Sequence, residues 1–266
     1  MKYLQGKTIV LTGASSGIGR EMSKRLVRNY GAMVIGIGRN EDKLKALKTQ
    51  LGDKFRYHAM DVSVKENWEN FANTLKMEGA GIDLLINNAG VFPQFARVEN
   101  MTSEEIEAVM TVNFYASVYA VECMFPLLGK TGGIVNICSS GSLCTVVGTS
   151  AYSASKSAMK GYTEALILEE KDRYVGLIYP GTTATELFRN DENTKNSALD
   201  LVAMSAEKMS KKILRKIDKK RKRAVVGLDA KAMNLLAKLA PVWGLSLIAW
   251  VMKSSKSKVF DRVFKK

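Results

Sequence analysis

Short apolar runs alternate with longer amphipathic segments over most of the chain. The apolar runs are strand-like and fall at residues 8–12, 33–37, 55–59, 83–87, 133–139, 174–179 and 224–226. Helical spacing of apolar residues occurs at residues 17–30, 41–51, 65–78, 103–128 and 150–170, and residues 182–205 show looser patterning. Strands that alternate with helices predict a parallel sheet covered by helices on both faces. We therefore expect an α/β fold with a doubly wound parallel sheet of about seven strands.

The chain is long enough for one large α/β domain. It has 266 residues, 46% of them hydrophobic, and no internal repeat or low-complexity linker divides it. We assign residues 1–228 to a single domain and residues 229–266 to a basic, amphipathic helical extension.

The formal net charge is +14, and the excess lies near the C-terminus. Residues 1–207 contain 22 lysines and arginines against 23 acidic residues, whereas residues 208–266 contain 18 against 3. Residues 208–223 place Met209, Ile213 and Ile217 at helical spacing, so one face can pack while the lysines face solvent. Basic surfaces attract nucleic acid or anionic lipid, but this run has no aromatic residues for base stacking. We expect a solvated helix face and no nucleic-acid binding.

Cysteine and histidine usage argues against a metal site. Cys123, Cys138 and Cys144 have no CxxC spacing, and His58 is the single histidine, so we expect no bound metal. The N-terminus runs into a strand-like segment without a secretory pattern. We therefore expect a cytoplasmic protein, with peripheral membrane association as a further hypothesis based on the basic C-terminal region.

A glycine-rich segment follows the first predicted strand and opens the first predicted helix. It contains Gly13, Ser15, Ser16, Gly17, Ile18 and Gly19. Glycine allows a tight turn and a close approach to a pyrophosphate, whose charge is stabilised by free N–H groups at the start of a helix. In the strand-turn-helix context, this segment predicts a dinucleotide site.

The end of the second predicted strand indicates which dinucleotide is bound. Sites for NAD usually place a carboxylate here, whereas sites for NADP place a basic residue. This chain has Gly38 followed by Arg39, whose guanidinium suits a phosphate. We predict that NADP(H) is preferred over NAD(H); the alternative is that Arg39 faces solvent.

Tyr152 and Lys156 are four residues apart in a predicted helix, so their side chains share one face. A free tyrosine has a pKa of roughly 10, and a nearby cation favours the phenolate. We therefore expect Lys156 to lower the pKa of Tyr152 and the pair to exchange a proton with a substrate oxygen.

These features occur in the order typical of one family. The glycine-rich segment is followed by Asp61-Val62, Asn87-Asn88-Ala89-Gly90, Asn113, Ser139, Tyr152-Ser153-Ala154-Ser155-Lys156 and Pro180-Gly181. Over about residues 5–228 the chain resembles the classical short-chain dehydrogenases/reductases, and in particular NADP(H)-dependent hydroxysteroid dehydrogenase-like members with an extended C-terminal tail. The resemblance implies a Rossmann-like catalytic domain that binds cofactor and substrate.

The resemblance also implies roles for individual residues. Tyr152 matches the catalytic acid/base, and Lys156 the residue that lowers its pKa and holds the nicotinamide ribose. Ser139 matches the hydroxyl that orients the substrate oxygen, and Asn113 the residue that positions a water in the proton relay. The remaining cofactor contacts implied are Asp61 and Val62 at the adenine, Asn88, Ala89 and Gly90 beside the cofactor, and Pro180, Gly181, Thr182 and Thr185 at the nicotinamide and phosphates.

Apolar loop residues are the candidates for substrate contacts, and some of them are expected to pack the core instead. They are Phe92, Pro93, Phe95, Leu143, Val146, Val147, Leu187 and Phe188. They predict a hydrophobic alcohol or ketone as the small-molecule partner. From the resemblance, a hydroxysteroid or bile acid is the leading substrate class, and a 3-oxoacyl thioester or general carbonyl compound is the alternative. Outside enzymes, the alternative is a non-catalytic NADP-sensing protein.

The C-terminal extension departs from the compact core of the family. Residues 230–239 have the spacing of an amphipathic helix, and residues 241–252 form an apolar stretch with Trp243 and Trp250. This stretch is too short to span a bilayer, which requires about 20 residues. Coverage of the substrate mouth, a subunit contact and an interfacial position on a membrane all remain open. We also expect a homo-oligomer, either a dimer or a tetramer.

Overall fold

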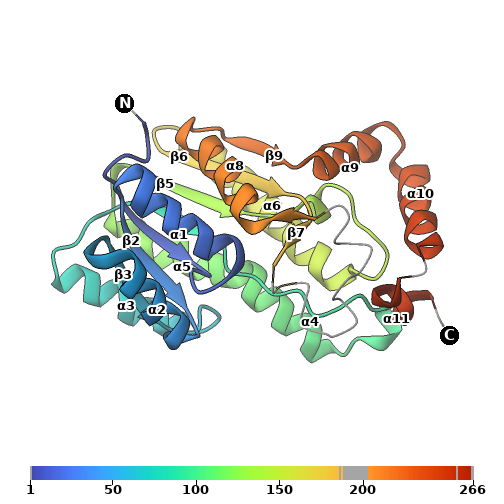
Figure 1. The fold of residues 1–266 in the computed structure, drawn as a ribbon, viewed down its shortest axis with the longest axis horizontal. Helices are drawn as coiled ribbons and strands as arrows, with labels where there is room; N and C mark the ends of the chain where they lie inside the picture. Colours follow the sequence, from blue (N-terminus) through green and yellow to red (C-terminus); the bar gives the residue numbers. More distant parts are fainter. Residues whose placement is uncertain (1, 186, 188–202, 256, 265–266) are drawn as a thin grey trace.

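The computed structural model describes residues 2–185, 187, 203–255 and 257–264 (Figure 1). Within these residues, seven parallel strands form one sheet in the order β3-β2-β1-β4-β5-β6-β9. The strands are β1 (Thr8–Thr12), β2 (Met33–Gly38), β3 (Phe55–Ala59), β4 (Ile82–Asn87), β5 (Leu128–Ile137), β6 (Tyr174–Pro180) and β9 (Arg223–Val226). Two short strands, β7 (Thr183–Ala184) and β8 (Met204–Ser205), pair separately. The predicted doubly wound parallel sheet is confirmed.

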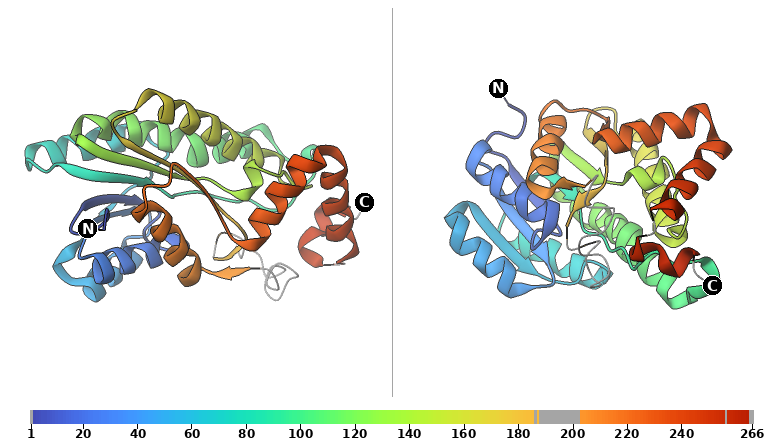
Figure 2. Two further views of the ribbon diagram at one scale, coloured as in Figure 1. Left: turned by 90° about the horizontal axis from the view of Figure 1, so that it is seen from above. Right: turned by 45° about the vertical axis from the view of Figure 1, so that its right-hand side comes forward.

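Helices cover both faces of the sheet (Figures 1 and 2). One face packs against α1 (Gly17–Tyr30), α2 (Glu41–Leu51) and α8 (Ala206–Asp218). The other packs against α3 (Lys65–Met77), α5 (Ala116–Met124) and α6 (Ser150–Glu169). The remaining helical segments are η1 (Gly52–Lys54), η2 (Val98–Asn100), α4 (Ser103–Met110), η3 (Thr111–Tyr115), η4 (Phe125–Leu127), η5 (Ser140–Ser142), α9 (Leu228–Leu239), α10 (Pro241–Ser254), η8 (Lys258–Phe260) and α11 (Asp261–Phe264).

Two predicted elements differ from the structure. Strand β5 begins at Leu128, earlier than the predicted start at residue 133. Its pairing with β4 shifts register between Ile82 and Leu84, and the strand therefore includes a glycine-containing stretch. The helix predicted over residues 103–128 is not α-helical throughout, because the π-helical turn η3 lies between α4 and α5. By length and composition alone, Ser103–Leu127 resembles a membrane span, a test that buried helices also pass. It packs against α3 and α6 within the protein.

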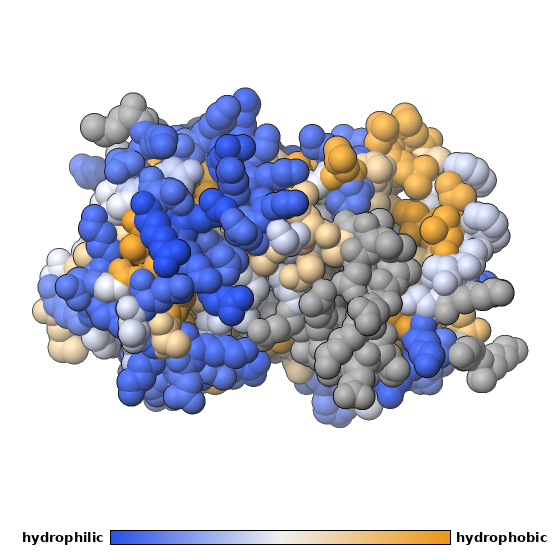
Figure 3. Space-filling view, viewed as in Figure 1, coloured by the Kyte–Doolittle hydropathy of each residue, from blue (hydrophilic) through white to orange (hydrophobic). Residues whose placement is uncertain are grey.

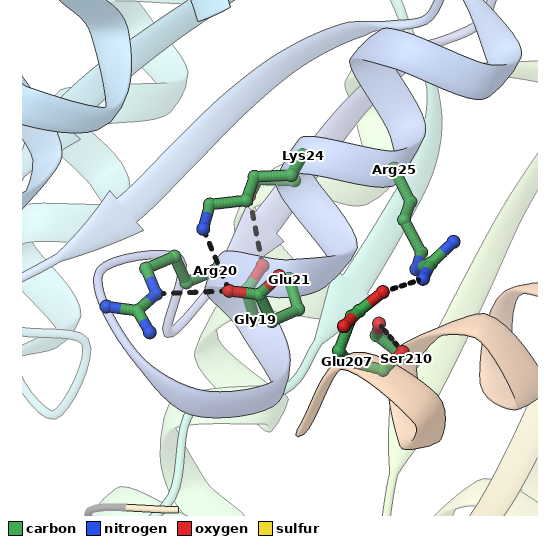
Figure 4. Close-up of polar contacts among 8 residues, drawn as sticks. Gly19, Arg20, Glu21, Lys24, Arg25, Glu207 and Ser210 are labelled. Carbon is green, nitrogen blue, oxygen red and sulfur yellow. Dashed lines mark hydrogen bonds and ion pairs between the residues drawn. The ribbon is translucent and has the colours of Figure 1, made fainter. Parts of the chain in front are cut away.

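Helix α8 has the predicted division between an apolar and a basic face. Met209, Ile213 and Ile217 are fully buried, while the lysines between them are exposed. The helix packs beside α1, and the carboxylate of Glu207 pairs with the guanidinium of Arg25 at 2.8 Å (Figure 4). The basic run therefore has a packing role on one face and is solvated on the other.

The C-terminal extension begins where the sheet ends. Helices α9 and α10 form a hairpin beyond β9, and η8 and α11 turn back toward α4 (Figure 1). The carboxylate of Asp229 accepts a hydrogen bond from the backbone N–H of Thr182 at 2.6 Å, which ties the start of α9 to the end of β6. A division near residue 228 coincides with the start of α9, and we retain it as a proposal.

Candidate active site

A cavity of about 340 Å³ opens at the carboxyl ends of the central strands. It lies where the strand order reverses between β1 and β4, the place where doubly wound sheets bind ligands. The predicted residues that line it are Gly13, Ser16, Gly17, Ile18, Arg39, Asn88, Ala89, Gly90, Ser139, Tyr152, Lys156, Pro180, Gly181, Thr182 and Thr185. The folded chain thus brings together most of the site predicted from sequence.

Close packing explains the glycines of the β1–α1 turn. Gly13 has a φ of 67°, and a Cβ atom there would lie 2.9 Å from Nδ2 of Asn88. A Cβ atom at Gly19 would lie 2.1 Å from the carbonyl oxygen of Gly13. The hydroxyl of Thr12 accepts hydrogen bonds from the N–H groups of Asn88 and Ala89, at 2.8 and 2.9 Å, and so joins this turn to the end of β4.

The start of α1 fits an anionic group. Among the described residues, no side chain caps this end of the helix, and its first turn contains no acidic residue. Gly17 and Ile18 of this first turn line the cavity. Free N–H groups and the helix dipole therefore face the cavity, which suits the pyrophosphate of a dinucleotide.

Four predicted cofactor residues, Ser15, Gly19, Asp61 and Val62, are absent from the described lining of the cavity. Gly19 is buried inside the turn, where it allows the close approach to Gly13. The carboxylate of Asp61 accepts hydrogen bonds from the backbone N–H and the hydroxyl of Ser63, at 2.9 and 2.7 Å. Burial raises the pKa of Asp61, but these hydrogen bonds and the charge of Arg39 outweigh it and lower the pKa overall.

Tyr152 lies in the cavity wall, and its side chain is buried against an aromatic ring. Its ring centroid is 5.1 Å from that of Phe92. Burial is the largest influence and raises the pKa of Tyr152 to about 12, a hydrogen bond with Ser139 lowers it, and the nearby Cys138 raises it. The predicted lowering of this pKa by Lys156 is therefore wrong for this structure, because the removal of the phenol from water dominates.

Lys156 is also buried in the wall of the cavity. Its Nζ donates to the carbonyl oxygen of Ile137 at 3.4 Å. Burial lowers the pKa of this ammonium group, and the opposing influence of Cys138 is smaller. A Cβ atom at Gly90 would lie 3.4 Å from this Nζ and 3.0 Å from Oδ1 of Asn113, so the glycine leaves room for both side chains at this point.

Asn113 lies at the π-helical turn η3 and is fully buried. Its Oδ1 accepts from the N–H of Val91 at 2.7 Å, and its Nδ2 donates to the carbonyl oxygen of Val91 at 2.9 Å. The same Nδ2 donates to the hydroxyl of Ser155 at 3.1 Å. Asn113 therefore holds the loop after β4 against α6, and it is not among the described residues that line the cavity.

Sequence comparison identifies the family. The family model described as short chain dehydrogenase matches residues 7–196, most of the chain. The protein belongs to the short-chain dehydrogenase/reductase family. It is an oxidoreductase of that family, whose members use NAD(P) cofactors.

Known relatives of this short-chain dehydrogenase/reductase are 29–32% identical to it over the residues that they match. SadH of Mycobacterium tuberculosis, named as an oxidoreductase, is 30% identical over 256 residues, which is 90% of this chain and 92% of SadH. The 3beta-hydroxysteroid dehydrogenase 2 of Eggerthella lenta is 32% identical over 69% of this chain and 74% of its own length. The bovine (Bos taurus) 3-ketodihydrosphingosine reductase is 29% identical over 90% of this chain and 77% of its own length.

Solved structures show the same fold. A short-chain dehydrogenase from Streptomyces avermitilis has a TM-score of 0.79 and 25% identity, with 94% of this chain and 98% of that chain covered. A serine dehydrogenase solved in its closed form with NADP+ has a TM-score of 0.71 and 27% identity, with 77% of this chain and 87% of that chain covered.

In this short-chain dehydrogenase/reductase, Tyr152 is part of an apolar cluster. Its buried members are Phe92, Phe95, Tyr152, Phe260 and Val263, with Val146, Val147, Leu187, Met252, Val259 and Phe264 packed around them. Of the predicted substrate contacts, Leu143 packs elsewhere, beside Cys138 and Met159. Phe188 lies outside the described residues, and Pro93 is not among the members of the cluster.

The sequence left open whether the C-terminal extension covers the substrate mouth, and the residues of the extension that reach this cluster were not identified from it. The rings of Phe95 and Phe260 lie 5.0 Å apart, and a Cβ atom at Gly148 would lie 2.5 Å from a methyl group of Val263. The apolar spacing of residues 259, 260, 263 and 264 was the available signal, since it indicates a short helix with one buried face. The extension therefore forms one wall of the apolar region beside Tyr152.

Proposed function

We propose that the protein is an NADP(H)-dependent oxidoreductase that interconverts a secondary alcohol and a ketone on a hydrophobic substrate. The observation that carries the proposal is the position of Tyr152. This one side chain lies both in the wall of the dinucleotide cavity and in the apolar cluster. A phenol in this position can reach a carbonyl oxygen whose substituents pack against apolar side chains.

The residues present fit a dinucleotide. Gly13, Gly17 and Ile18 would hold the pyrophosphate at the start of α1, and Lys156 the nicotinamide ribose. Arg39 lines the cavity, is exposed, and would bind the additional phosphate of NADP(H). When bound, the dinucleotide supplies or accepts the hydride.

The side chains of this chain supply the proton chemistry. Because the pKa of Tyr152 is raised to about 12, its phenol is protonated near neutral pH and acts as the proton donor when a ketone is reduced. Ser139, which hydrogen-bonds Tyr152, orients the substrate oxygen. Lys156 and Asn113 both approach Gly90, and we assign to them the path that resupplies the proton.

The apolar cluster favours a bulky hydrophobic substrate. We propose a hydroxysteroid or bile acid as the leading class, supported by the similarity to the 3beta-hydroxysteroid dehydrogenase of Eggerthella lenta. The second candidate is a 3-oxoacyl thioester or another long-chain carbonyl compound. The similarity to 3-ketodihydrosphingosine reductase favours it, because that match extends over 90% of this chain. We propose a cytoplasmic location for the enzyme.

A substrate screen tests the proposed function. Steroids, bile acids, 3-oxoacyl thioesters and simple ketones are each supplied with NADPH, and its oxidation is followed by absorbance. We expect turnover of at least one hydrophobic ketone and weak turnover of small ketones. Tight NADPH binding without turnover of any class would instead support a non-catalytic NADP-sensing protein.

A further inference from the structure

The hairpin of α9 and α10 exposes an unusual amount of apolar surface. Of the 14 large hydrophobic residues that are exposed in the described chain, eight lie between residues 228 and 251. They are Leu228, Leu235, Leu239, Val242, Trp243, Leu245, Trp250 and Val251. We call these eight residues the hairpin surface; the apolar side chains gathered over α9 and α10 are visible in Figure 3. Apolar patches of this kind mark a contact with a membrane or another protein.

Helix α10 is only partly covered by the rest of the described chain. Gly244 is its one buried residue among those described, and a Cβ atom there would lie 2.8 Å from Cγ of Leu236 in α9. The two helices therefore pack closely at this glycine, while Trp243 and Trp250 remain 65% and 64% exposed. A helix that is apolar on most sides is normally buried, so α10 requires a further partner.

The charges of the extension are arranged for an anionic partner. Residues 228–266 contain eight lysines and arginines and two aspartates. Lys231, Lys238 and Lys253 are exposed on the hairpin, whereas Asp229 and Asp261 are both partly buried. Asp229 is held by the backbone of Thr182. The outward charge around the hairpin surface is therefore positive.

We propose that the hairpin of α9 and α10 docks the enzyme on the surface of an anionic lipid membrane. The 14 residues of α10 give a helix of about 21 Å, shorter than the hydrocarbon core of about 30 Å, so it lies in the interface and does not cross it. Tryptophans favour the interface, and lysines around an apolar face bind anionic headgroups. A second copy of the chain fits less well, because its own cations would face these cations.

The docked surface is continuous with the active site. Met252 of α10 packs against the apolar cluster that contains Phe260, Phe95 and Tyr152. This step rests on the proposed function: a ketone or alcohol dissolved in the membrane would reach the phenol of Tyr152 past Met252 without passing through water. Docking itself does not depend on the reaction, so it is tested without turnover.

The test is co-sedimentation of the full-length enzyme with vesicles at low salt. Vesicles of phosphatidylcholine are compared with vesicles that also contain phosphatidylglycerol, and tryptophan fluorescence is recorded on the same samples. Trp68 is fully buried, so a blue shift on binding reports on Trp243 and Trp250. We expect binding to the phosphatidylglycerol vesicles that weakens as salt is added.

Matched variants locate the contact. The double variant Trp243→Ser/Trp250→Ser should lower vesicle affinity at least about tenfold, whereas Met77→Ser/Leu168→Ser, at exposed apolar positions elsewhere, should leave it unchanged. Lys231→Glu/Lys238→Glu/Lys253→Glu should also weaken binding, more than Lys211→Glu/Lys212→Glu/Lys216→Glu on the exposed face of α8. Unchanged NADPH binding in each variant confirms an intact fold.

Three results would overturn the proposal. The first is an absence of vesicle binding by the wild-type enzyme, and the second is equal loss of binding in the α8 variant and the hairpin variant. The third is a dimer in sedimentation velocity that dissociates in the double tryptophan variant, together with no vesicle binding, which would assign the hairpin surface to a second copy.

Discussion

The ring of Phe92 lies edge-on to the phenol of Tyr152, with the ring centroids 5.1 Å apart and the ring planes at 79°. Phe92 also contacts Phe95, which contacts Phe260 of the C-terminal extension. This chain of aromatic rings excludes water from one side of Tyr152 and explains why the pKa of its phenol is raised.

The first prediction concerns the titration of Tyr152. Its pKa is about 12 in the folded protein against 10.0 for an unperturbed tyrosine, so the neutral phenol favours the folded state. This contribution, about 2–3 kcal/mol from two pKa units, is complete below pH 10 and is lost as the pH rises from about 10 to about 12. The difference in ultraviolet absorbance between wild type and Tyr152→Phe, followed as the pH rises, gives the midpoint of the Tyr152 titration directly. A midpoint at or below pH 10 would refute the raised pKa.

The second prediction concerns the glycine turn. In Gly19→Ala the new methyl group meets the carbonyl oxygen of Gly13, so the turn must shift. We expect the free energy of unfolding to fall by about 1–3 kcal/mol and NADP(H) affinity to fall about tenfold or more. Denaturant unfolding and fluorescence titration measure the two effects.

Gly161→Ala is the matched control, since it lies exposed in α6 with no atom within 4 Å of a new Cβ. It should increase stability by up to about 1 kcal/mol and leave cofactor affinity unchanged. Equal cofactor affinity in the two alanine variants would contradict the role given to Gly19.

The third prediction concerns Asn113. Asn113→Ala leaves the N–H and carbonyl groups of Val91 without their side-chain partner. We expect the free energy of unfolding to fall by about 1–3 kcal/mol, and turnover to fall by a larger factor than NADPH affinity. Asn29→Ala, at an exposed position in α1, should change stability by less than about 0.5 kcal/mol. A variant of Asn113 with wild-type stability would show that these hydrogen bonds do not hold the loop.

The fourth prediction concerns cofactor choice. Arg39→Asp should raise the Michaelis constant for NADP(H) much more than that for NAD(H), because a carboxylate repels the additional phosphate and accepts from ribose hydroxyls. Arg28→Asp, exposed in the last turn of α1, is the control for net charge. An equal change with both cofactors would refute the assignment of Arg39.

Local patterns account for what was predictable from sequence. The β1–α1 turn follows from glycines between a strand and a helix, and the position of Tyr152 and Lys156 in one cavity follows from their spacing on α6. Both depend on residues close together in the chain, where backbone geometry determines the outcome.

The unpredicted features depend on contacts between distant segments. The pKa of Tyr152 is set by burial against Phe92, within a cluster completed by Phe95 and Phe260, and sequence spacing does not reveal that burial. The π-helical turn at Asn113 has the composition of an ordinary helix, and the contacts of Asn113 with Val91 and Ser155 join segments that are distant in the sequence. The sequence therefore predicts which residues form the site, but it does not predict the pKa of Tyr152.

The central claim is that Tyr152 donates a proton to the oxygen of a hydrophobic ketone. The most direct measurement compares wild type with Tyr152→Phe, using a ketone turned over in the NADPH screen, with Tyr162→Phe on the same helix as the control. We predict that Tyr152→Phe lowers turnover at least about a hundredfold while its NADPH affinity stays within about threefold of wild type, and that Tyr162→Phe retains activity. Turnover by Tyr152→Phe at the wild-type rate would contradict the account.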